Sequence, residues 1–127
     1  MAPPRPAAAG RGATCLLVAL LASFLALPVI ASDLPEAAEK PLWCASAFNW
    51  LARDADDAAD AAGAEVFDAW SLVFTALATT VLGEAGYAPP AIEAAIAASD
   101  QAVLEEMQDR SMRYDVESCP ELAPPEE

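Results

Sequence analysis

Cys44 and Cys119 are the residues whose type and placement most directly allow chemistry, because two thiols can join as a disulfide. The third cysteine, Cys15, lies in an N-terminal segment that we expect to be removed on export. Two thiols near the two ends of an exported domain are typical of a structural disulfide. Closing a loop of this length stabilises a fold by about 4 kcal/mol on the loop-entropy argument. We therefore predict a Cys44–Cys119 disulfide.

The residues on which most enzymes depend are missing from the sequence. The chain has no histidine, which removes the commonest general base and the commonest metal ligand. It also has no Gly-x-Ser-x-Gly element, no glycine-rich phosphate loop and no haem-attachment motif. Paired carboxylates can cleave glycosides, but 20 acidic residues make chance pairs unavoidable. We predict no catalytic residue, no cofactor and no enzymatic activity.

The aspartates between residues 54 and 60 could supply oxygen ligands for calcium or magnesium. Their spacing departs from the EF-hand pattern, since Ala58 stands at the third ligand position. On a helix these carboxylates project outward and converge poorly, so we favour a solvated face with an Arg53–Asp57 pair. The alternative is a divalent-cation site on three side chains: Asp56, Asp57 and Asp60.

Trp43 and Trp50 are seven residues apart, so they lie on one line of a predicted helix. That line lies about 110° from the centre of the helix's apolar stripe, beside its acidic face. Aromatic side chains with a polar border are typical of a partner surface. Because tryptophan is also highly buried on average, cover by the next helix or by the Tyr87 loop is the alternative. Our hypothesis is a partner surface of Trp43, Trp50, Asn49 and Asp54.

The N-terminal segment has the three regions of a secretory signal peptide. Residues 1–12 contain Arg5 and Arg11 but no acid, and residues 13–30 contain no charge. Small residues then precede the predicted cleavage after Ala31, with cleavage after Ser32 as the alternative. An uncleaved membrane anchor is the other interpretation of this run. A spanning helix needs about 20 apolar residues, whereas this run has 18 and includes Thr14, Ser23 and Pro28, so we favour cleavage.

Cleavage would make the chain more acidic. Residues 32–127 keep all 20 acids but only four bases, which gives a net charge of −16; the bases are Lys40, Arg53, Arg110 and Arg113. This charge repels nucleic acids and anionic membranes, so we predict no nucleic-acid partner and no membrane binding after cleavage. A basic protein partner fits this charge better. The proportions of the signal and the alanine-rich composition are typical of a high-GC bacterium, which predicts a periplasmic protein.

The mature chain is predicted to be helical because it is rich in alanine and has few β-branched residues and no alternating runs. We expect a mobile lead-in at 32–41, a first helix over about 42–62 and a second over about 64–85. The second helix has no charge between Asp68 and Glu84, so we expect neighbours to cover it on more than one side. Proline and glutamate dominate residues 120–127, which predicts a disordered acidic tail.

The disulfide constrains how the third helical region, after Pro89-Pro90, can run. Three antiparallel helices would place the cysteines about 30 Å apart, whereas a disulfide requires α-carbons within about 7 Å. A break near Ser99-Asp100, two good N-cap residues, would give four helices and bring Cys119 back. Alternatively, the helix ends near Arg110 and the chain returns extended. We favour the four-helix arrangement with the break near Ser99-Asp100.

The predicted fold is therefore all-α: a small bundle of three to four helices over residues 42–119, closed by the disulfide between Cys44 and Cys119. The predicted function is that of an exported, non-catalytic binding, adaptor or inhibitor-type protein. The alternatives are a divalent-cation-binding protein, or a membrane-tethered accessory subunit if the signal is not cleaved.

Overall fold

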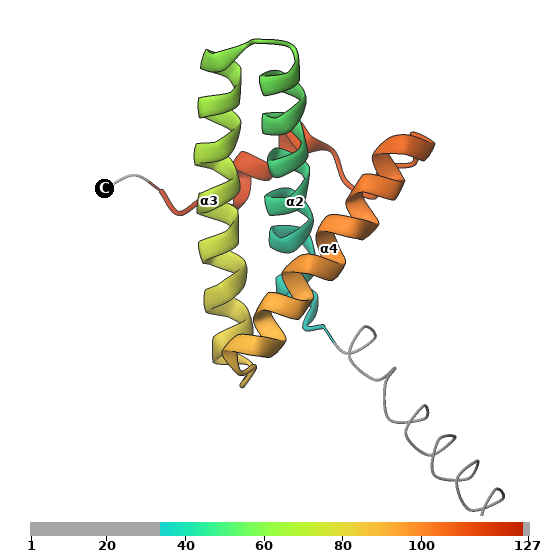
Figure 1. The fold of residues 1–127 in the computed structure, drawn as a ribbon. Coiled ribbons are helices and arrows are strands. Elements are labelled where there is room, and N and C mark those ends of the chain that lie inside the picture. Colours follow the sequence, from blue (N-terminus) through green and yellow to red (C-terminus); the bar gives the residue numbers. More distant parts are fainter. Residues whose placement is uncertain (1–33, 126–127) are drawn as a thin grey trace, which may run out of the picture. The chain divides into compact units, whose positions relative to one another are not determined.

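The computed structural model describes residues 34–125, which form three α-helices followed by a short 3-10 helix, with no strand among them. The elements are α2 (Glu36–Asp57), α3 (Ala61–Glu84), α4 (Pro89–Asp109) and η1 (Val116–Leu122). Figure 1 shows α3 running beside α2, with α4 crossing α2 obliquely. The predicted all-α fold is confirmed. The predicted signal peptide, residues 1–31, lies outside the described residues.

The first helix begins at Glu36, earlier than the sequence predicted. Pro41 lies inside α2, where it removes one backbone hydrogen bond, and we had taken it as part of the lead-in. The helix continues through it because Ala38 and Leu42 bury their side chains, at 0% and 2% exposure. The predicted mobile lead-in at 32–41 is therefore wrong for residues 36–41.

α2 ends at Asp57, before the predicted end at residue 62, because Asp60 caps the next helix. The Asp60 carboxylate accepts a hydrogen bond of 3.0 Å from the backbone N–H of Gly63. A side chain at position 63 would collide with this cap, since a Cβ there would lie 2.2 Å from Asp60 Oδ2. Asp60 and Gly63 together therefore fix the turn between α2 and α3.

The core falls into two clusters, and both include residues of α2. One cluster surrounds the disulfide; its buried large residues are Trp43, Phe48, Phe74 and Val103. The other lies where α3 meets α4; its buried members are Ala38, Leu42, Ala78, Leu82, Ile92 and Ala95. The small alanine side chains of α2 allow the neighbouring helices to approach closely, as the predicted apolar stripe implied.

Phe74 is the centre of an aromatic group in the first cluster. Its ring stacks on Phe48 at 5.7 Å and on Trp70 at 5.6 Å between centroids, and it is fully buried. Phe48 also contacts Phe67 and Trp70 at 6.0 and 6.2 Å. These contacts join α2 to the part of α3 between Phe67 and Phe74.

α4 is one continuous helix through Ser99 and Asp100, so the favoured break there is wrong. Both residues contact α2 and do not cap a helix. Ser46 Oγ donates to Ser99 Oγ at 2.9 Å, and the Asp100 carbonyl accepts a hydrogen bond from Trp50. α4 ends at Asp109, with Arg110 in the left-handed conformation (φ 56°), as in the alternative arrangement.

The chain then returns through residues 111–115 to η1, which lies against α2. Cys44 and Cys119 are both fully buried, with α-carbons 5.8 Å apart, and form the predicted disulfide. Pro120–Leu122 belong to η1, and Leu122 is half-buried against the core. The predicted disordered tail at 120–127 is therefore wrong for these three residues.

Candidate functional site

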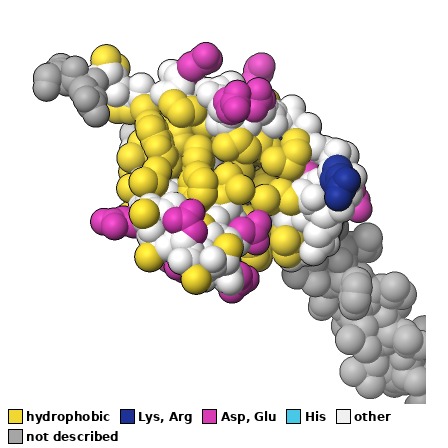
Figure 2. All heavy atoms as spheres, turned by 90° about the horizontal axis from the view of Figure 1, so that it is seen from above, with side chains coloured by type: hydrophobic (Ala, Val, Ile, Leu, Met, Phe, Trp, Pro, Cys, Tyr) yellow, Lys and Arg dark blue, Asp and Glu magenta, His cyan; other side chains and the backbone are white. Residues whose placement is uncertain are grey.

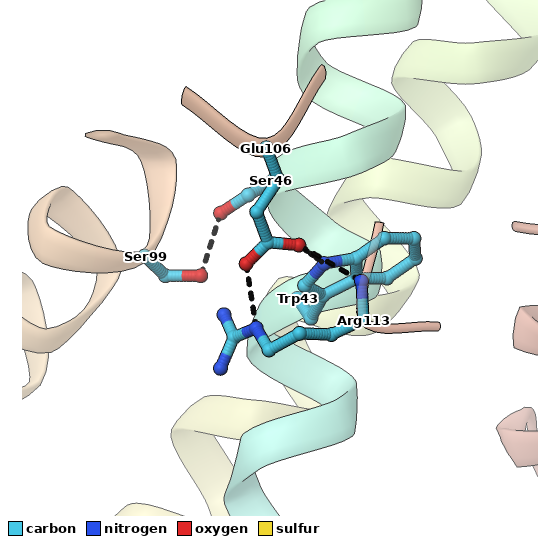
Figure 3. A network of polar contacts seen from close by, with 5 residues as sticks. All are labelled: Trp43, Ser46, Ser99, Glu106 and Arg113. Atoms are coloured by element: carbon cyan, nitrogen blue, oxygen red, sulfur yellow. Dashed lines mark hydrogen bonds and ion pairs between the residues drawn. The ribbon is translucent and has the colours of Figure 1, made fainter. Parts of the chain in front are cut away.

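Trp43, a predicted member of a partner surface, lies in the core with 0% exposure. Its indole Nε1 donates a 2.8 Å hydrogen bond to Glu106 Oε2, as Figure 3 shows. The rings of Trp43 and Tyr114 pack edge to face, with their centroids 5.5 Å apart. The partner-surface prediction is wrong at this residue, because α4 and the returning chain cover this flank of α2.

Trp50 is half-buried and joins α2 to α4. Its Nε1 donates to the backbone carbonyl of Asp100 at 2.9 Å, and the Arg53 guanidinium lies 4.7 Å from its ring centroid. Asn49 is half-buried and Asp54 is exposed. The polar end and one face of the Trp50 ring are therefore occupied within the chain, and the predicted surface is not a single exposed patch.

Glu106 is the carboxylate that organises this side of the domain (Figure 3). Besides the Trp43 bond, it accepts hydrogen bonds from Arg113 Nε at 2.5 Å and from the Arg113 backbone N–H at 3.1 Å. Its side chain is 15% exposed. Burial alone raises its pKa, but the hydrogen bonds from Trp43 and Arg113, with the charge of Arg113, together lower the pKa below its ordinary value.

We expect Glu106 to make the domain acid-sensitive. A carboxyl whose pKa is lowered in the folded state stabilises the fold above its unfolded pKa, and this contribution disappears as the pH falls through the folded value. Glu106→Gln should therefore lower the free energy of unfolding by about 1–3 kcal/mol at neutral pH. In urea titrations this difference between wild type and variant should close at acidic pH, once the pH has fallen through the lowered folded pKa of Glu106. Glu93→Gln, an exposed acid on the same helix, is the control. An equal gap at both pH values would contradict this role.

The aspartates of the predicted cation site, Asp56, Asp57 and Asp60, are all exposed. The side chain of Asp60 caps α3, and Arg53 stacks on Trp50, so the predicted Arg53–Asp57 pair is absent. Within residues 34–125 the single ion pair is Arg113–Glu106. No three acidic or cysteine side chains of the described residues converge to hold a metal. The geometry gives the cation site on Asp56, Asp57 and Asp60 no support.

α3 is covered on one side, which corrects the expectation that neighbours enclose it. Its fully buried side chains are Ala64, Phe74, Ala78 and Leu82. Leu72, Val66 and Val73 are 71%, 55% and 39% exposed. Of the described helices, α3 alone is long and apolar enough to cross a membrane by length and composition. Here it is packed along α2, where Ser71 Oγ donates to the Ala45 carbonyl at 2.9 Å.

An apolar groove of about 670 Å³ runs between the exposed flank of α3 and the C-terminal segment; we call it the α3 groove. Four of its lining residues come from α3 and four from the C-terminal segment: Val66, Ala69, Trp70, Val73, Pro120, Ala123, Pro124 and Pro125. Its volume falls within the range of about 300–1,000 Å³ typical of ligand sites. No lining side chain carries a charge, so the groove suits apolar groups.

Acidic side chains border the α3 groove. Glu65 is next to the lining residue Val66 on α3, and Glu121 is next to the lining residue Pro120 on η1, which also carries Glu117; all three are exposed. Neither α3 nor η1 contains a lysine or arginine. Figure 2, seen from the end where α2 joins α3, shows hydrophobic side chains gathered together with acidic ones around their edge. The site is therefore apolar inside and negative outside.

No family model matches this chain, and no curated protein and no solved structure matches it either. The interpretation of the site therefore rests on this chain's own geometry and charge. Of the residues singled out from the sequence, the structure joins Cys44 to Cys119 and separates the two tryptophans from any common surface. The α3 groove was not predicted, although helix periodicity puts Val66, Trp70 and Val73 on one face of α3.

Proposed function

We propose that this chain is an exported, non-catalytic binding protein that holds a basic protein partner in the α3 groove. One observation carries the proposal: an exposed, mainly apolar groove without a charged lining side chain is bordered by unpaired acids on elements that contain no base. Monomeric proteins rarely leave large apolar areas open unless something binds there. The partner segment would place apolar side chains over Trp70 and lysines or arginines beside the acids.

The charge of the exported chain supports a basic partner. Three of its four bases are engaged within the fold: Lys40 lies over the Tyr114 ring, Arg53 over Trp50, and Arg113 is paired with Glu106. Most carboxylates therefore face water without a compensating charge. Such a field attracts cationic proteins, raises their association rate and weakens with salt.

The export prediction and the disulfide support an extracytoplasmic site of action. Disulfides form and persist in oxidising compartments such as the bacterial periplasm. Cys44 and Cys119 are consumed by this bond, which leaves no thiol nucleophile in the described residues. The proposed role is accordingly binding, adaptor or inhibitor-type, in the periplasm.

A pair of synthetic peptides tests the proposal. Each is about 15 residues long, enough for four helical turns, with a leucine stripe; one has lysine flanks and its twin has glutamate flanks. We expect the lysine peptide to bind and to change the emission of Trp70, which lines the groove. The binding should weaken at about 0.5 M salt, where exposed charges are screened. Equal binding of the glutamate twin, or no binding of either peptide, would refute the proposal.

Matched aspartate variants of α3 locate the binding. Val73→Asp places a charge in the groove and should weaken the lysine peptide about tenfold or more, as expected when a buried apolar contact is replaced by a charge. Thr79→Asp adds the same charge to an exposed position of the same helix outside the groove lining. It should leave binding unchanged or slightly tighter. Equal losses in both variants would place the binding elsewhere.

A further inference from the structure

We propose that the Cys44–Cys119 disulfide assembles the α3 groove, so that the chain becomes competent to bind only after oxidation. The inference rests on the proposed function, since it concerns the same groove. Half of the lining comes from the C-terminal segment: Pro120, Ala123, Pro124 and Pro125. Cys119 is the residue directly before the first of these. Whatever holds Cys119 in place therefore also holds that wall of the groove.

The hydrogen bonds of the C-terminal segment do not attach it to the helices. The Glu117 N–H and the Ser118 hydroxyl both donate to Asp115, and the Ala123 N–H donates to the Pro120 carbonyl. These bonds shape the 3-10 turn but stay within it. Residues 116–125 are attached to the body by the disulfide to α2 and by the half-buried side chains of Val116 and Leu122. Apart from the peptide chain itself, the disulfide is the single covalent part of that attachment. The Arg113–Glu106 hydrogen bonds and the Tyr114–Trp43 contact anchor the chain just before this segment.

Because the disulfide is buried, its formation accompanies the docking of the C-terminal segment onto the core. Both cysteines have 0% exposure, so a reductant reaches the sulfurs only when the segment detaches. Formation of the bond removes two protons and two electrons from the two thiols. A disulfide oxidant, such as a thiol–disulfide oxidoreductase or oxidised glutathione, accepts them and becomes a dithiol or two thiols. Before this step the tail is free to leave α3, and the groove has one wall.

The sequence order fits this role. Cys44 lies in α2 and Cys119 in η1, after α3 and α4, so the bond can form only once all three helices have been synthesised. The helices themselves do not depend on it for their pairing. α2 and α3 are joined by the aromatic stack on Phe74 and by the Ser71–Ala45 hydrogen bond. We therefore expect the unoxidised chain to keep its three helices and to lose the groove.

The test compares three forms of the exported chain: oxidised wild type, Cys44→Ala/Cys119→Ala, and Leu122→Ser with the disulfide intact. The Leu122 variant removes a side chain that packs the tail onto the core. Circular dichroism checks that each form is helical. Acrylamide quenching of Trp70 and titration with the lysine-flanked peptide then report the groove. Trp70→Phe in each background isolates the Trp70 signal from that of Trp43 and Trp50.

We expect both variants to expose Trp70 to acrylamide and to bind the peptide about tenfold more weakly than the oxidised chain. A helical double-cysteine variant with wild-type quenching would overturn the inference. Loss of all helicity in that variant would also overturn it, because the bond would then hold the whole fold. If the oxidised chain fails to bind the peptide while quenching still rises in both variants, the proposed function fails and the assembly role stands.

Discussion

Phe74→Ala is expected to lower the free energy of unfolding by about 3–5 kcal/mol, the range found for buried aromatic residues. The side chain is fully buried and stacks on both Phe48 and Trp70, so its loss leaves a cavity between α2 and α3. Because Trp70 also lines the α3 groove, the groove should loosen with the core. Urea denaturation followed by circular dichroism measures the change.

Leu72→Ala is the matched control for this prediction. Leu72 lies two residues away on the same helix, and 71% of it is exposed. An exposed substitution of this kind should change stability by no more than about 0.5 kcal/mol. A Phe74→Ala protein as stable as Leu72→Ala would mean that the aromatic stack does not hold α3 on α2, and the described packing would be wrong.

Loss of the disulfide is the second large effect. Cys44→Ala/Cys119→Ala should lower the free energy of unfolding by about 4 kcal/mol, because the bond closes a loop of 75 residues in the unfolded chain. A domain of this size has a total stability of about 5–15 kcal/mol. The variant should therefore stay folded at room temperature but melt well below the oxidised protein.

Reduction provides the internal check. Dithiothreitol should lower the denaturation midpoint of the wild-type protein toward that of the double variant and leave the double variant unchanged. Both cysteines lie in the described core, so no other thiol of residues 34–125 contributes. A wild-type midpoint that does not respond to prolonged reduction in denaturant would contradict the assigned bond.

The fold class could be predicted because it depends on the amino-acid composition and on the number of cysteines in the exported chain. Alanine-rich segments without alternating patterns favour helices, and two cysteines near the ends of an exported chain favour one disulfide. The ends of the helices depended on single contacts that the sequence shows less clearly. Asp60 became an N-cap because Gly63 leaves room for its carboxylate. Ser99 and Asp100 are residue types that cap helices as well as Asp60 does, yet they lie inside α4 and accept hydrogen bonds from Ser46 and Trp50 of α2.

The tryptophan surface was mispredicted for a long-range reason. Trp43 needs an acceptor for its indole N–H, and that acceptor is Glu106, which is 63 residues away in the sequence. Local helix geometry placed Trp43 beside the apolar stripe, where either burial or exposure was possible. Only the crossing of α4 over α2 decides between them. The polar partners of a buried tryptophan are set by tertiary structure and leave no local pattern.

The α3 groove could be predicted only in part. Helix periodicity puts Val66, Trp70 and Val73 on one face of α3, and this face does line the groove. The face is open because α4 packs mainly on α2 and because the chain returns as a short 3-10 helix. The periodicity of the sequence does not determine which apolar face of a helix is left without a covering helix. An apolar helix face in a small domain is therefore a candidate binding surface as well as a candidate core.

A chemical-shift titration tests the central claim most directly. Backbone amide spectra of the oxidised, exported chain are recorded as the lysine-flanked peptide is added. The account predicts the largest shifts at the groove lining, with Val66, Trp70, Val73 and Ala123 among them, and small shifts around Trp50. The largest shifts at Trp50 and the neighbouring aspartates, or no shifts at all, would contradict binding in the α3 groove.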